Sequence, residues 1–152
     1  AKLKPMVNPN VQGKKYPETP SYLVGREKIR EFAAAVFSTN PINHDVAAAK
    51  SAGYADLVAP PTFGVVIQER SLHDVLADPE ADIDFSRVVH GDQRFVLNRP
   101  IVAGDELTSV LTVASVKALG AHSMITFNTE IFDIKKDLVC TAISTLVVRG
   151  GE

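Results

Sequence analysis

The stretch that most constrains the fold is residues 58–76, where two prolines precede an apolar run that then becomes polar. Proline is favoured in the first turn of a helix, because the N–H that it lacks would have no partner there. Residues 63–67 contain no polar side chain, so this segment should be covered on all sides. Four polar residues then supply a wetter end: Gln68, Glu69, Arg70 and Asp74. We therefore predict one central helix over about residues 61–76, around which other elements must wrap.

The chain before this helix contains short elements separated by turn signals. Residues 1–19 hold several prolines and little hydrophobic pattern, which indicates an N-terminal tail or a draped arm. A short strand is predicted at 22–24, an amphipathic helix at 26–36 and an alanine-rich helix at 46–52. The Asn40-Pro41 pair is a strong turn signal between the two helices. This half of the chain is therefore helical, with one break.

The second half changes to the alternating pattern of strands. Four runs are rich in Val, Ile, Thr and Phe and are separated by turn signals: 88–97, 106–117, 123–134 and 138–149. Four long strands with short connections predict an antiparallel meander, one face of which can cover the central helix. Helices early and strands late predict an α+β class, with a single domain over residues 20–150.

Composition limits the classes of function. The chain has 152 residues, enough for one domain, and its net charge of -2 without a basic stripe argues against a nucleic-acid partner. No apolar run approaches the roughly 20 residues of a membrane span, and no signal-peptide core is present, so we expect a cytoplasmic protein. The single cysteine, Cys140, cannot form an internal disulfide, and its apolar neighbours indicate a buried thiol.

Three stretches carry a resemblance to a known family. They are 40–45 (NPINHD) with 53–54 (GY) behind it, 58–63 (VAPPTF), and 90–95 (HGDQRF) continuing to 99–105 (RPIVAGD). In order and spacing they resemble the MaoC-like dehydratases, and more closely the FAS1-like dehydratase N-terminal branch, over about residues 20–149. The pattern is particularly similar to the mycobacterial-type (3R)-hydroxyacyl-ACP dehydratase subunits that act in pairs, one catalytic and one not. The resemblance implies a hot-dog fold, in which an antiparallel sheet wraps around a central helix.

The resemblance also implies a chemistry, the addition or removal of water next to the carbonyl of an acyl thioester. Active family members place an Asp two residues before the Asn-Pro pair and a His two residues after it, and a glycine N–H at the central helix faces the thioester oxygen. Here these positions fall on Ser38, Asn43 and Pro61. Serine and asparagine do not exchange protons near neutral pH, and proline has no N–H. We therefore expect no catalytic residue at these positions.

Two histidines are candidate substitutes. His44 lies one place beyond the missing histidine and reaches the site if the loop bulges by one residue; otherwise it decorates a turn, with Asp45 at the start of the alanine-rich helix. His90, before a glycine and an acid, is expected to have a structural role at a strand start. The four histidines show no metal-ligand spacing, so neither a metal nor another cofactor is expected.

The leading hypothesis is a hot-dog subunit of a (3R)-3-hydroxyacyl-thioester dehydratase or hydratase in fatty-acid metabolism, which binds acyl-ACP or acyl-CoA but is not catalytic alone. It would form a homodimer, or a heterodimer with a catalytic hot-dog subunit. Six residues are candidate liners of the acyl slot, with core packing as the alternative for each: Pro61, Thr62, Phe63, Val66, Ile67 and Phe95. Other hypotheses are an active homodimer using His44 or His90, an acyl thioesterase, and a non-enzymatic acyl-binding module.

Overall fold

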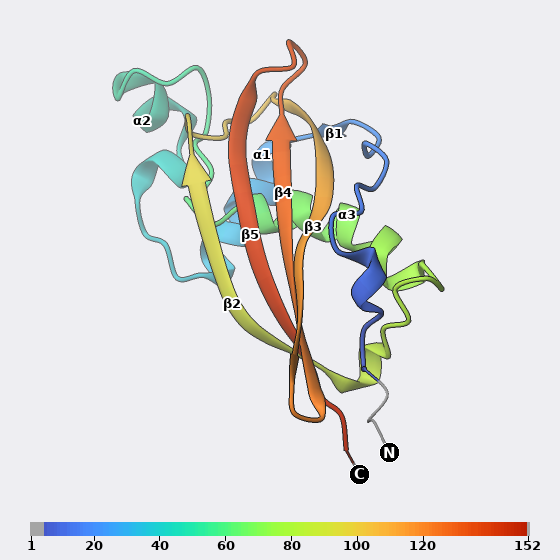
Figure 1. The fold of residues 1–152 in the computed structure, drawn as a ribbon. Coiled ribbons are helices and arrows are strands. Elements are labelled where there is room, and N and C mark those ends of the chain that lie inside the picture. Colours follow the sequence, from blue (N-terminus) through green and yellow to red (C-terminus); the bar gives the residue numbers. More distant parts are fainter. Residues whose placement is uncertain (1–4, 152) are drawn as a thin grey trace.

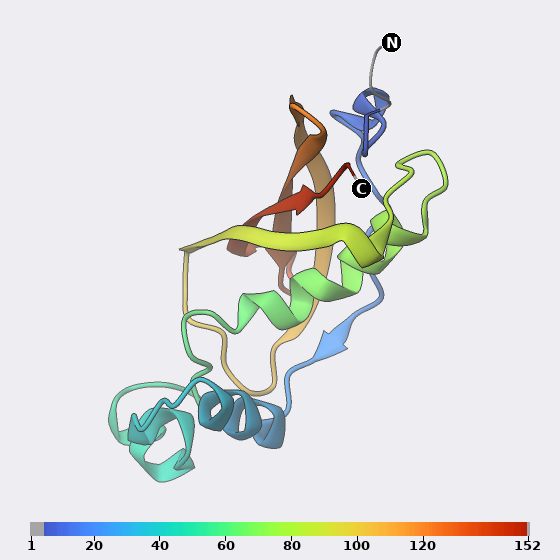
Figure 2. The ribbon, with the colours of Figure 1, turned by 90° about the horizontal axis from the view of Figure 1, so that it is seen from below.

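The chain folds as an antiparallel sheet curled around one long helix, as Figures 1 and 2 show for a computed structural model that describes residues 5–151. The elements in chain order are η1 (Pro9–Val11), β1 (Tyr22–Leu23), α1 (Arg26–Ala35), η2 (Pro41–Asn43), α2 (Val46–Ser51), α3 (Gly64–Ala77), η3 (Phe85–Arg87), β2 (Val88–Leu97), β3 (Glu106–Leu119), β4 (His122–Phe132) and β5 (Leu138–Val148). The α+β class and the sheet wrapped around a central helix are thus confirmed.

The strand order is β1-β3-β4-β5-β2, with all neighbours antiparallel. β3, β4 and β5 form a meander, but the prediction that β2 continues it is wrong, because β2 pairs with β5 at the other edge. Residues 98–105 cross the end of the sheet between β2 and β3. This crossing is held to the segment before α3, where Val102 forms an isolated bridge with Val58 and the Ala59 N–H donates to the Ile101 carbonyl over 2.8 Å.

The central helix begins at Gly64, three positions later than predicted. The Phe63 N–H donates to the Pro60 carbonyl over 2.9 Å, so the two prolines form a tight turn that leads into the helix. The helix buries one face along its whole length and exposes the other, and Gln68 lies on the buried face, only 3% exposed. Its assignment to the wetter end is therefore wrong, because its amide is hydrogen-bonded inside the core to Ala142 and Gln93.

The N-terminal arm is part of the core. Within residues 5–19, Val7 and Val11 are fully buried and join a cluster that includes Val75 and Phe127. The arm runs beside β3, where the Gly13 N–H donates to the Val113 carbonyl over 2.8 Å. The sequence pattern underestimated these two valines, because a short irregular segment has no periodicity to mark its buried side. Residues 1–4 of the predicted tail lie outside the described residues.

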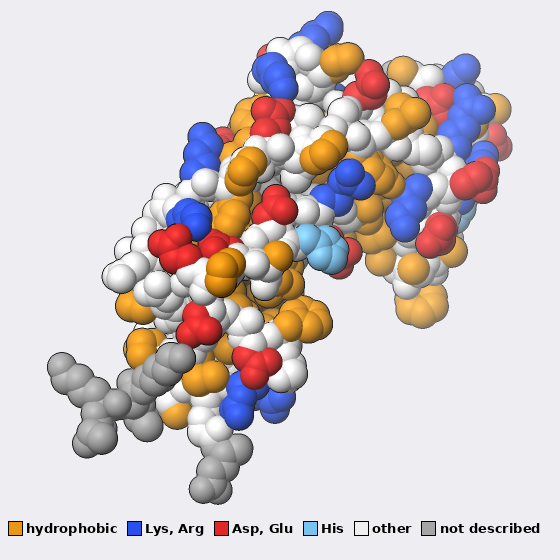
Figure 3. Space-filling view, turned by 90° about the vertical axis from the view of Figure 1, so that its right-hand side faces the viewer, with side chains coloured by type: hydrophobic (Ala, Val, Ile, Leu, Met, Phe, Trp, Pro, Cys, Tyr) orange, Lys and Arg blue, Asp and Glu red, His pale blue; other side chains and the backbone are white. Residues whose placement is uncertain are grey.

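Residues 5–151 contain neither a candidate membrane-spanning helix nor a candidate metal site. None of the described helices is long and apolar enough to cross a membrane. Within the same residues, no group of three or more His, Cys, Asp or Glu side chains is arranged to hold a metal ion. Acidic and basic side chains are interspersed on the face that Figure 3 shows, without a stripe of one sign.

Candidate functional site

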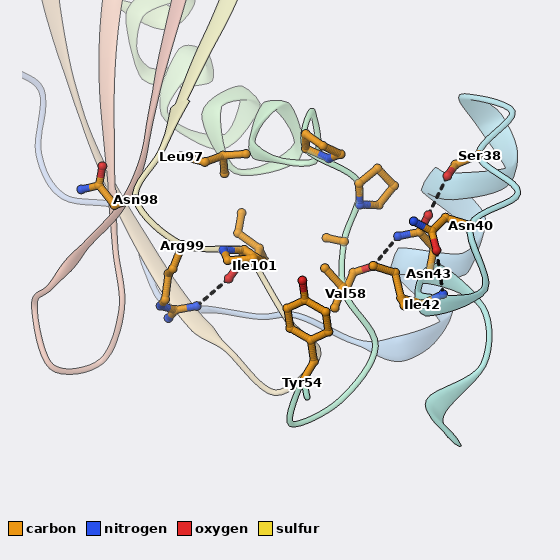
Figure 4. Close-up of a pocket in the computed structure, with 14 residues that line it drawn as sticks. Ser38, Asn40, Ile42, Asn43, Tyr54, Val58, Leu97, Asn98, Arg99 and Ile101 are labelled. Carbon is orange, nitrogen blue, oxygen red and sulfur yellow. Dashed lines mark hydrogen bonds between the residues drawn. The ribbon is translucent and has the colours of Figure 1, made fainter. Parts of the chain in front are cut away.

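A pocket of about 400 Å³ lies where the segment before α3 meets the end of β2 (Figure 4). Three parts of the chain form its walls: the loop after α1, the turn that leads into α3, and the crossing after β2. The lining residues are Ser38, Asn40, Ile42, Asn43, Tyr54, Val58, Ala59, Pro60, Pro61, Leu97, Asn98, Arg99, Pro100 and Ile101. Parts of all three stretches that carry the family resemblance thus meet at one cavity, the third only through residues 99–101.

The side chains of Ser38 and Asn43 lie at the wall of the pocket and are hydrogen-bonded to each other. The Ser38 hydroxyl donates to the Asn43 side-chain oxygen over 2.6 Å, and the Asn43 amide donates to the Val58 carbonyl over 2.7 Å (Figure 4). Asn43 is only 3% exposed. Both ends of its amide are therefore used to join the loop after α1 to the segment before α3, and this pair has no acid or base to offer.

His44 lies beside the pocket but does not line it. Its Nε2 is 2.8 Å from the Ser38 carbonyl oxygen, and its own carbonyl accepts a hydrogen bond of 2.9 Å from Arg30. The predicted turn role agrees with these contacts. Asp45 caps α2 by accepting from the Ala47 N–H over 2.8 Å, as a side chain at the start of a helix should.

His90 lies near the start of β2, whereas the pocket is at the end of this strand, so His90 does not line the pocket. Its Nε2 is 3.0 Å from the Ser144 hydroxyl and 3.2 Å from the Gln93 side-chain oxygen. A bulge between His90 and Asp92 allows His90 and Gln93 to share a face of the sheet although they are three positions apart. The ring is therefore part of a polar network between β2 and β5.

The rest of the pocket wall offers few reactive groups. Arg99 is engaged, because its guanidinium donates to Asp105 over 2.8 and 3.1 Å and to Asp133 over 3.3 Å. The hydrogen bonds to Asp105 raise the already high pKa of Arg99 further. Tyr54 points its hydroxyl toward the cavity (Figure 4). Pro60 and Pro61 have no backbone N–H, so this turn cannot donate to a thioester oxygen from either position.

The family model described as "FAS1-like, dehydratase domain region" matches residues 10–142. The chain belongs to the FAS1-like dehydratase family. A UPF0336 protein of Leifsonia xyli subsp. xyli is 66% identical over 146 residues, covering 96% of this chain and 98% of the relative. A UPF0336 protein of Clavibacter michiganensis subsp. michiganensis is 53% identical, with the same coverage.

Solved structures place this FAS1-like domain among hot-dog dehydratases. A chain of the HadBC (3R-hydroxyacyl-ACP dehydratase) complex from Mycobacterium tuberculosis superposes with a TM-score of 0.81 at 31% identity, covering 90% of this chain and 96% of that one. A MaoC-like dehydratase gives 0.79 at 31% identity, covering 93% of this chain and 43% of that one. A chain of the ChsH1-ChsH2 complex, also from Mycobacterium tuberculosis, superposes with a TM-score of 0.70 at 21% identity, a likeness that shows the fold alone. The resemblance to MaoC-like and FAS1-like dehydratases is thus confirmed.

In this FAS1-like domain, the predicted acyl-slot residues are in different surroundings. Pro61 lines the pocket, and Thr62 is exposed beside it. Phe63 and Ile67 are fully buried, and the Phe63 ring meets Phe32 edge-on at 5.3 Å between ring centres. These two side chains are core. The two half-buried side chains, Val66 and Phe95, pack at the margin of the core on opposite elements, α3 and β2.

Several pocket residues were not singled out from the sequence of this FAS1-like domain. Leu97 was not named at all, and Tyr54 and Ile101 were named only within the stretches that carry the resemblance, because the three come from separate segments and no local pattern marks them as neighbours. The crossing at 99–105 was recognised only as part of the family motif. Cys140 is buried as predicted, and burial raises the pKa of its thiol to about 11, so it is not a nucleophile at neutral pH.

Proposed function

We propose that the chain is the acyl-binding, non-catalytic subunit of a (3R)-3-hydroxyacyl-thioester dehydratase or hydratase in fatty-acid metabolism. The observation that carries the proposal is the closed set of hydrogen bonds from Ser38 to Asn43 and from Asn43 to Val58. Hydration of an enoyl thioester needs one group to take a proton from water and one to give a proton to the carbon next to the carbonyl. Neither side chain titrates near neutral pH, and both are already occupied.

The oxyanion position supports the same conclusion. As the thioester carbonyl gains negative charge, it needs donors aimed at its oxygen. The turn before α3 presents Pro60 and Pro61 to the cavity, and neither has an N–H. Losing one such donor costs roughly 100- to 1000-fold in rate where it has been measured. A chain without the acid, the base and the donor would therefore bind the thioester and leave the chemistry to another subunit.

A partner subunit has a surface to cover. β2 is an edge strand that pairs only with β5 among the described elements, and its outward side chains Val89 and Val96 are 45% and 54% exposed. An exposed strand edge with apolar side chains is a site for pairing with another sheet. The neighbours that are solved as complexes, HadBC and ChsH1-ChsH2, support pairing with a second hot-dog chain.

Two assays on the purified chain test this proposal. Alone, with a short enoyl-CoA, it should show no turnover above the buffer rate, and with an acyl-CoA it should release no free thiol. Turnover that disappears in His44→Ala or His90→Ala would replace the proposal with the active homodimer, and thiol release would replace it with a thioesterase. A hot-dog subunit that carries the catalytic Asp and His should co-purify with the chain when the two are co-expressed, and it should be more active with the chain than alone. A strict homodimer that ignores that subunit contradicts the pairing.

A further inference from the structure

The core between the sheet and α3 is divided in two. One hydrophobic cluster lies at the pocket end and includes Phe63 and Ile67; the other lies at the far end and includes Val75 and Phe127. Between the two clusters, both α3 and the sheet bury polar side chains. They are Gln68 and Ser71 on α3, and Ser109, Thr129 and Ser144 on β3, β4 and β5. Buried polar groups in a small core need a hydrogen-bonded role, so this polar belt requires an explanation.

Gln68 is the centre of the polar belt. Its amide nitrogen donates to the Ala142 carbonyl over 3.2 Å and is 3.4 Å from the Thr129 hydroxyl. Its oxygen accepts from the Gln93 amide over 3.0 Å. The Gln93 oxygen in turn lies 3.2 Å from the His90 ring. The side chain of Gln68 is thus satisfied in the core, and it bonds the central helix to the edge strand.

The contacts between β2 and α3 form a seam that leads inward from the pocket. Leu97 lines the pocket at the end of β2. Two positions back, the Phe95 ring approaches Gly64, and a Cβ built on this glycine would lie 3.3 Å from the ring. Two positions further, Gln93 meets Gln68. Four strand residues span about 14 Å, so Leu97 and Phe95 form the β2 side of a closely packed seam of that length between the pocket and the amide pair.

We propose that this seam is the path of the acyl tail and that the Gln68–Gln93 pair ends it, so that the subunit selects medium-length acyl chains over long ones. The inference rests on the proposed acyl-binding function and adds its specificity. Phe95 is half-buried on an edge strand and can turn aside, whereas Phe63 and Ile67, in the cluster against which it packs, are fully buried. The tail therefore displaces Phe95 and stops at the amides.

The selection follows from the cost of breaking the pair. A methyl group that ends against two satisfied amides leaves their hydrogen bonds intact. A longer tail must separate Gln93 from Gln68, which leaves the buried amide oxygen of Gln68 without a donor. This loss lowers the affinity for the longer acyl chain by about tenfold or more. In an open apolar groove the opposite order holds, because each further methylene buried increases affinity.

Binding of octanoyl-CoA and palmitoyl-CoA to the full chain, measured by calorimetry below their micelle concentrations, tests the proposal. We expect palmitoyl-CoA to bind at least about tenfold more weakly than octanoyl-CoA. Gln93→Ala, at a half-exposed position, should remove this difference, and Q68L/Q93A should do so without an unpaired amide at position 68. The control T126V/T145V replaces a hydrogen-bonded pair of 3.1 Å between β4 and β5 outside the seam and should leave the preference unchanged.

The outcomes separate the two proposals. Equal or tighter binding of palmitoyl-CoA to the natural chain overturns the assignment of Gln68–Gln93 as the end of the path and leaves acyl binding in place. A preference that survives in both glutamine variants does the same. Failure of both acyl-CoAs to bind, while the chain is folded, overturns the acyl-binding function and this inference with it.

Discussion

Replacing Asn43 by alanine should destabilise the chain because Asn43 acts as a clamp between two segments. The substitution removes the bonds of 2.6 Å to Ser38 and 2.7 Å to the Val58 carbonyl. Each hydrogen bond contributes about 1 kcal/mol net, and a buried carbonyl left without a donor costs about 1–3 kcal/mol. Val58 is 5% exposed, so water does not easily replace the amide. We expect a loss of about 2–4 kcal/mol in the free energy of unfolding.

The assay is urea unfolding followed by circular dichroism, at two protein concentrations so that any dimer is accounted for. For a domain of this size, the expected loss lowers the melting temperature by roughly 4–15 °C. Asn40→Ala is the matched control. Asn40 is an exposed asparagine in the same loop, and within residues 5–151 its side chain accepts one hydrogen bond, of 3.2 Å from the Ile42 N–H. Its replacement should cost about 1 kcal/mol or less.

A second variant separates the two bonds of Asn43. Asn43→Asp keeps an acceptor for the Ser38 hydroxyl but places a carboxylate oxygen against the Val58 carbonyl, which then has no donor. It should be at least as destabilising as Asn43→Ala. The clamp reasoning is refuted if Asn43→Ala unfolds within about 0.5 kcal/mol of the natural chain, or no more easily than Asn40→Ala.

Three further predictions concern the arm, the seam and acid stability. The hydrogen bond from Lys14 lowers the pKa of Asp78 to about 2, so this carboxylate stabilises the fold above its unfolded pKa near 4, and the contribution is lost as pH falls from about 4 to 2; the unfolding midpoint of Asp78→Asn should vary less over that range, and an unchanged profile would contradict it. Gly64→Ala should lower stability by about 1–2 kcal/mol in urea, because crowding against the fully buried Cys140 sulfur, 3.3 Å from the added Cβ, outweighs the better helix propensity; stabilisation would refute the close contact. Val11→Ala should lower the free energy of unfolding by about 2 kcal/mol within a single unfolding transition, because Val11 is fully buried in the core. A separate early transition would mean that the arm is not part of the core.

The candidate site was only partly predictable. Counting from the Asn-Pro pair located Ser38, Asn43 and Pro61, and all three line the pocket. The sequence could not show that Ser38 and Asn43 bond each other, because the loop geometry depends on where Val58 is held. It left Phe63 and Ile67 as candidate liners of the acyl slot with core packing as the alternative, because an apolar residue looks the same in either setting; both are buried in the core.

The sequence by itself determined the elements and the family. The prolines and apolar run before α3, and the alternation in the four strand segments, depend on residues within a few positions of one another, so periodicity reveals them. Only the tertiary structure decided that β2 crosses to the edge beside β5, and that the bulge after His90 turns His90 and Gln93 to one face. It alone made Gln68 a core residue. The partners of such a side chain lie on distant segments, and local pattern carries no information about which distant segments meet.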